Sequence, residues 1–131
     1  MWHPHQERAY SERIEVRKNN DEWQGAQSIL AGAECRVIAK VPEKLRGREL
    51  ALRIMTADEY SGMLESGGDD MRSHLAWVPA RVEGSTIVSS FAVPEDWSGK
   101  RIRLCLVDAE ALSSPARRVG VGGWHDWQVL S

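Results

Sequence analysis

Apolar and polar residues alternate with a period of two along most of this chain, whereas a sustained helical period of 3.6 residues is hard to find. Because successive side chains of a strand point to opposite faces of its sheet, this alternation predicts strands with one buried face. Gly, Pro and Asn residues separate the alternating runs and predict turns. The predicted strands are residues 10–17, 34–41, 48–56, 74–82, 86–93, 100–107 and 117–130.

Two stretches near the N-terminus leave alternatives open. Residues 7–17 also fit a short helix, although Ile14 and the other apolar residues favour a half-buried strand. Residues 23–33 are ambiguous, with Ile29-Leu30 as a short strand and Gly32 as the turn that follows it.

Local signals also predict how some strands are arranged. Residues 34–41 and 48–56 are expected to form a hairpin with a connection of about five or six residues. Pro79 lacks a backbone N–H, so its strand should be an edge strand or be bulged there. Residues 57–64 fit a single helical turn with Asp58 as its cap.

The closing segment carries the clearest fold signal, because two alternating runs flank a polar connection. We therefore predict an all-β fold, an antiparallel β-sandwich of the jelly-roll kind, with about eight strands and at most one or two short helical turns. Residues 1–9 are expected to form a flexible tail, and residues 10–131 a single β-sandwich domain.

The amino-acid composition limits the classes of partner that this chain is expected to bind. The 131 residues are 42% hydrophobic and 27% charged, and 17 basic against 19 acidic residues give a formal charge of −2. Without a strong positive field, nucleic acid is not expected as a partner. No run approaches the roughly 20 apolar residues of a membrane helix, so no membrane partner is expected.

The N-terminal residues and the cysteines indicate in which cellular compartment the protein is expected. Residues 1–8 lack the apolar core of a signal peptide, so a cytoplasmic location is expected unless a leader has been removed. Strand parity places Cys35 on an apolar face, and Cys105 on the face that carries Arg101 and Arg103. The two cysteines should therefore be free thiols in different environments.

Tryptophans supply the main candidate binding residues, since they are six of the nine aromatic residues. A flat indole with one N–H donor suits stacking on a sugar or anchoring an interface. Trp127 is expected in the core and Trp97 in an exposed turn. The Trp124 side chain could equally cover the core or stack on a ligand. Trp77 is a further candidate binding residue.

His125 and Asp126 complete the candidate site. Their proximity suggests an oriented imidazole, but adjacent residues of a strand point to opposite faces and cannot easily pair as base and orienter. Another histidine, His74, lies far from His125 in the sequence. With Asp108 and His125 it forms the least favoured hypothesis, a small enzyme whose groups converge in a pocket.

No metal or cofactor is expected. The Cys and His spacings match no zinc motif, and the acidic loop 65–70 lacks the order of a calcium loop, so it should be solvated. Gly120, Gly122 and Gly123 precede no helix and form no phosphate loop. They more plausibly let the backbone bulge or approach another strand.

One segment resembles a known family. Its residues read W-S-G-K-R-I-R-L-C-L-V-D from Trp97 to Asp108, followed by V-G-V-G from Val119 to Gly122. This is similar to the closing strands of galactose-binding-like jelly-roll domains. The resemblance implies a non-catalytic sandwich that binds a ligand, often a carbohydrate. Gly122 and Gly123 stand where that pattern usually has an aspartate, so no calcium or ligand role of that aspartate carries over.

These observations favour a non-catalytic interaction module that binds a protein partner or another copy of itself. The alternative is a carbohydrate-binding module in which Trp97, Trp124 or Trp77 stacks on sugar rings. His125 and Asp126 would then supply hydrogen bonds.

Overall fold

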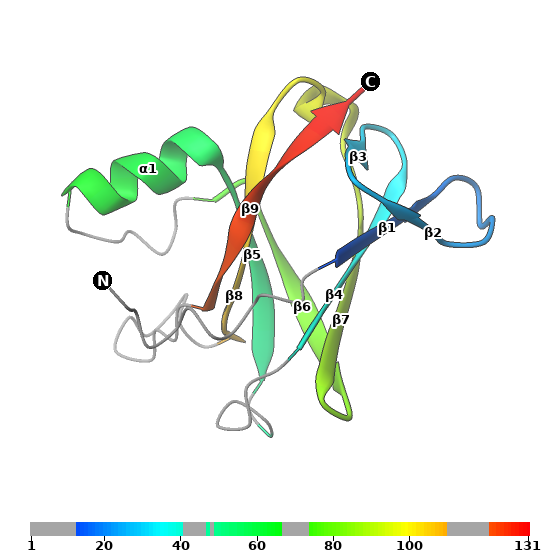
Figure 1. Ribbon diagram of the computed structural model, residues 1–131, viewed down its shortest axis with the longest axis horizontal. Helices are drawn as coiled ribbons and strands as arrows, with labels where there is room; N and C mark the ends of the chain where they lie inside the picture. The colour runs from blue at the N-terminus through cyan, green and yellow to red at the C-terminus, as the bar shows by residue number, and fades with distance from the viewer. Residues whose placement is uncertain (1–12, 41–46, 48, 67–73, 110–120) are drawn as a thin grey trace.

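The computed structural model describes residues 13–40, 47, 49–66, 74–109 and 121–131 (Figure 1). The predicted tail 1–9 lies outside these residues. Within them, the chain is mostly β, with one α-helix, α1 (Ala57–Ser66), and a short 3-10 helix, η3 (Glu95–Trp97). The strands are β1 (Arg13–Arg17), β2 (Gln24–Ala26), β3 (Ile29–Leu30), β4 (Glu34–Lys40), β5 (Leu50–Thr56), β6 (Ala76–Glu83), β7 (Thr86–Ala92), β8 (Arg101–Asp108) and β9 (Val121–Leu130).

The described strands form a single nine-stranded sheet in the order β2-β1-β4-β7-β6-β5-β8-β9-β3, which nearly closes into a barrel (Figure 1). The predicted all-β class is therefore confirmed. The sheet does not form a clear jelly-roll sandwich, and it is not wholly antiparallel, because β3 runs parallel to β9. Strand β6 lies in the middle of this order and pairs with β7 along one part of its length and with β5 along the other.

The predicted hairpin between residues 34–41 and 48–56 is wrong. Residues 34–40 and 50–56 are strands, but β4 pairs with β1 and β7, whereas β5 pairs with β6 and β8. The β6–β7 hairpin lies between them in the sheet. Alternation identifies the buried face of a strand but carries no information about its neighbour.

The barrel interior follows the predicted parity. Cys35 faces the interior, and Cys105 lies on the opposite face of the sheet, as expected; both are buried, and neither forms a disulfide. Strand β5 is buried on both faces, because α1 packs against the outside of β5 and β8. The interior cluster consists of Ile14, Ile29, Ala31, Cys35, Val37, Leu52, Ile54, Val93, Trp97, Ile102, Leu104 and Val129.

Helix α1 is longer than the predicted single turn, and its cap is Thr56 rather than Asp58. The Thr56 hydroxyl accepts a hydrogen bond from the Glu59 N–H at 3.0 Å. The Glu59 carboxylate in turn accepts from the Thr56 N–H at 3.0 Å. This reciprocal pair is a capping box, and its T-x-x-E pattern is readable in the sequence.

Candidate functional site

Pro79 interrupts the ladder between β6 and β7. The pairs Glu83–Thr86 and Arg81–Val88 lie in register beyond a two-residue turn. Hydrogen-bonded pairs recur at every second residue of an antiparallel ladder, so the next pair would join Pro79 to Ser90. Proline has no N–H to donate, and the β6–β7 pairing ends before this position.

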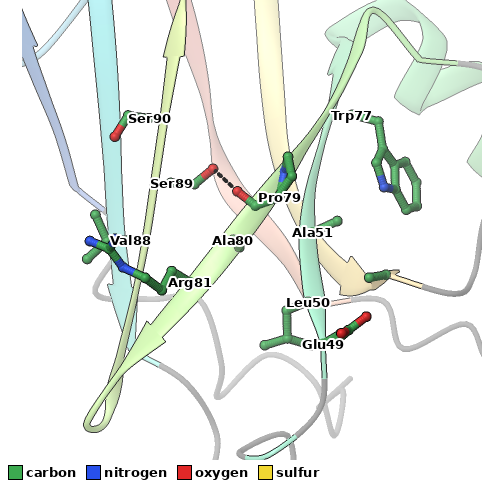
Figure 2. A pocket seen from close by; sticks show the side chains of 11 residues that line it. Glu49, Leu50, Ala51, Trp77, Pro79, Ala80, Arg81, Val88, Ser89 and Ser90 are labelled. Atoms are coloured by element: carbon green, nitrogen blue, oxygen red, sulfur yellow. Dashed lines mark hydrogen bonds between the residues drawn. The ribbon is translucent and has the colours of Figure 1, made fainter.

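The buried hydroxyl of Ser89 takes over one of the lost ladder bonds. Its side chain is only 2% exposed, and its Oγ donates to the carbonyl oxygen of Pro79 at 2.9 Å (Figure 2). The prediction that Pro79 marks an edge strand is wrong, because β6 has neighbours on both sides. The expected interruption is nevertheless present, since β6 separates from β7 beside this proline.

A surface groove of about 580 Å³ lies across β5, β6 and β7 at this separation (Figure 2). Apolar side chains form much of its wall, and Glu49, Arg81 and Ser90 add polar groups. The Arg81 side chain is 77% exposed and pairs with Glu83 at 3.2 Å, so it stays accessible from solvent. The groove is lined by Glu49, Leu50, Ala51, Trp77, Pro79, Ala80, Arg81, Val88, Ser89, Ser90 and Ala109.

Trp77 is the predicted binding residue that the structure places in this groove. Its half-buried ring packs against the small outward-facing pair Ala51 and Val107. The imidazole of His74 lies 5.5 Å from it, centroid to centroid, at an interplanar angle of 50°. These contacts fix the orientation of the indole at the groove wall.

Trp97 is not exposed, contrary to the prediction from its turn position. It is 6% exposed and belongs to the interior cluster, with its ring 6.2 Å from that of Phe91. The turn of η3, closed by Gly99 at φ +86°, directs the indole inward over the end of the barrel. A buried ring offers no stacking platform, so Trp97 is no longer a candidate binding residue. Trp127 is half-buried against the same cluster.

Asp126 pairs with arginines of the neighbouring strand β8. Arg103 donates from Nε to its carboxylate at 2.9 Å, and Arg101 lies at 3.2 Å. The Arg103 guanidinium also lies 4.3 Å from the Tyr60 ring centre. Burial lowers the pKa of Arg103, but its bonds and charge interactions with Asp126 and Tyr60 outweigh burial, leaving that pKa raised.

The side chains of Trp124 and His125 lie outside the described residues, so their predicted roles stay predictions. Their backbone belongs to β9, where Arg103 pairs with Asp126 but Cys105 pairs with Gly122. An advance of two positions along β8 is thus matched by four positions along β9, an irregularity of the kind expected from the glycines there.

Two groups of the small-enzyme hypothesis, Asp108 and His74, are not brought together. Asp108 pairs with Leu50 at one end of β5, whereas His74 lies beyond the Ile54–Ala76 pair at the other. Four strand residues separate these ends by about 13 Å. Among the described residues, no three His, Cys, Asp or Glu side chains gather closely enough to hold a metal ion.

The sequence interpretation missed the β7 side of the groove, Ser89 and Ser90, and also a cluster around Trp23. The guanidinium carbons of Arg17 and Arg36 lie 4.4 and 4.6 Å from the centre of the Trp23 ring. Pro79 was the available signal for the groove. Nothing local in the sequence shows which strand faces a proline.

No family model matches the chain, and no curated protein or solved structure matches it either. The resemblance to galactose-binding-like jelly-roll domains therefore stays a prediction. Among the helices of the described residues, none has the length and apolar character needed to cross a membrane.

Proposed function

We propose that this chain is a non-catalytic binding module that holds a protein partner, or a second copy of itself, in the groove beside Pro79. The observation that carries the proposal is the separation of β6 from β7. It opens an accessible groove where a regular hairpin would have been closed. Trp77 supplies an oriented aromatic anchor, and Arg81 supplies an exposed charge at the rim.

Site-specific photo-crosslinking tests this proposal. A benzoylphenylalanine replaces Val88, which lines the groove, or Lys18, an exposed residue before β2 that does not line it. We expect the Val88 probe to give a discrete adduct with a defined polypeptide in cells that make the chain. The Lys18 probe should not give that adduct.

The adduct distinguishes the two kinds of partner, since a second copy gives twice the mass of the chain and a different protein does not. The partner, identified by mass spectrometry, must then bind the unmodified chain as a purified protein. The same partner should bind a Trp77→Ala variant more weakly. Equal crosslinking from both positions, or no adduct at Val88, would refute the proposal.

The second candidate is a carbohydrate-binding module. It is favoured by the combination of the Trp77 indole with the Ser90 hydroxyl and the Glu49 carboxylate around one groove, because sugars bind by stacking and hydrogen bonding together. A glycan array tests it. Retention should be lost in Trp77→Ala and largely kept in Trp77→Phe, and an array without retained glycans would exclude it.

A further inference from the structure

A short free stretch of strand edge begins at the groove wall, with Ser90 in the groove and Ala92 next to it along β7. Residues at even positions of β7 point their N–H and C=O groups toward β6, as the Arg81–Val88 pair shows, while odd positions face β4. Val93 agrees with this parity, because its N–H bonds to Ala33 on the β4 side at 2.9 Å. The next even positions after Val88 are Ser90 and Ala92. Their backbone groups therefore point toward the opening beside Pro79.

These two residues are accessible. Both Ser90 and Ala92 are exposed, and within the described part of the chain neither has a ladder partner on this side. The Pro79 carbonyl, which would have accepted from Ser90, already accepts from Ser89. The edge therefore presents two donors and two acceptors, with the two residues about 6.8 Å apart along the strand.

From this arrangement we infer that the groove binds an extended segment of a partner protein, which adds as a strand to β7 at Ser90 and Ala92. The inference rests on the proposed function and specifies its ligand. A β-strand presents N–H and C=O groups on one edge at every second residue, which matches this spacing. An isolated sugar or a helix does not present such groups.

The charge at the groove selects among extended segments. Arg81 lies on β6 at the end of the opening nearest the β6–β7 turn, and it forms a solvent-exposed ion pair with Glu83. Exposed pairs of this kind are weak, so the guanidinium can turn to another carboxylate. Glu49, the acidic residue of the lining, lies next to β5 on the far side of β6 from β7, so the bound segment should carry an acidic side chain that faces Arg81.

The test uses a phage-displayed library of random nonapeptides, selected on the full chain. Enriched peptides should be acidic, and synthetic copies should bind Arg81→Glu several-fold more weakly than the native chain. Ser90→Pro removes the N–H that faces the opening, whereas Ser90→Ala keeps it and changes only the side chain. We expect at least about tenfold weaker binding to Ser90→Pro and unchanged binding to Ser90→Ala.

A second measurement needs no variant and covers the case in which Ser90→Pro fails to fold. Amide hydrogen exchange by NMR follows individual residues of the native chain with and without the selected peptide. Exchange at Ser90 and Ala92 should slow at least tenfold on binding. Exchange at Val88 and Phe91, whose N–H groups already face β6 and β4, should stay unchanged.

The outcomes separate the two proposals. Peptides that need Trp77 but leave Ser90 and Ala92 exchange unchanged would overturn strand addition and leave the proposed function standing. Equal binding to a folded Ser90→Pro variant would also overturn it. If the library yields no peptide whose binding depends on the groove, strand addition is refuted. If the crosslinking probe at Val88 also gives no adduct, the proposed function is refuted as well.

Discussion

Replacing Trp97 by alanine tests the largest difference between the sequence interpretation and the structure. The turn position of this residue suggests a solvent-exposed ring whose loss would matter little for stability. In the structure the ring lies inside the barrel, 6% exposed and beside Phe91. The substitution therefore creates a cavity at one end of the interior cluster.

The size of the effect follows from this burial. Truncation of a buried Trp or Phe to Ala costs about 3–5 kcal/mol, from lost transfer energy and the cavity that remains. A domain of this length has a total stability of roughly 7–20 kcal/mol. The cost corresponds to a fall in melting temperature of roughly 10–20 °C.

Thermal and urea unfolding followed by circular dichroism measure both quantities. Asp96→Ala is the matched control, because Asp96 is the exposed neighbour of Trp97 in the same 3-10 helix and its loss should cost less than about 0.5 kcal/mol. Trp97→Phe should be intermediate. A Trp97→Ala variant that unfolds with Asp96→Ala, within about 1 kcal/mol, would refute the assignment of Trp97 to the core.

Three further predictions concern the cap, the ion pair and the thiols. Thr56→Ala should destabilise the domain by about 0.5–2 kcal/mol in urea unfolding, and a change near zero would contradict the capping box. Asp126→Asn should lower stability by about 1 kcal/mol. Since the pKa of Arg103 is raised, its contribution is complete below its unfolded pKa and is lost only as pH rises through the higher folded value. The cost should thus stay flat from pH 6 to 9, and a marked slope would argue against the pairing. Cys35 and Cys105 should resist a thiol reagent in the native protein and react as two equivalents in denaturant; rapid native labelling would show that they are not buried.

The sequence predicted much of the fold at the level of single strands. Residues 34–40 and 50–56 are strands with the expected inward residues, and Ile29-Leu30 forms the short strand that its ambiguous segment allowed. These features depend on alternation and turn residues, which act over a few neighbours. Helix α1 could have been placed better, because the T-x-x-E capping box at Thr56 is a local signal.

The candidate site was less predictable. Trp77, one of the candidate binding residues, lies in the groove, and its binding role stays a prediction. Trp97 was expected to be exposed but lies in the core, since a turn position does not show whether the chain folds the ring inward or outward. Asp126 is held by Arg103 from a neighbouring strand, a contact between residues 23 positions apart. Such contacts depend on strand register, which one sequence does not specify.

The sequence by itself determined that this chain forms short strands, which face of each strand is apolar, and that Pro79 has no N–H to donate to a ladder. Only the tertiary structure decided that β6 bridges β5 and β7, that the sheet nearly closes, and that the interruption opens an edge at Ser90. The physical reason is the range of the forces involved. Side-chain alternation and the missing proline N–H are local properties, whereas the choice of neighbouring strand depends on how distant apolar faces are buried together.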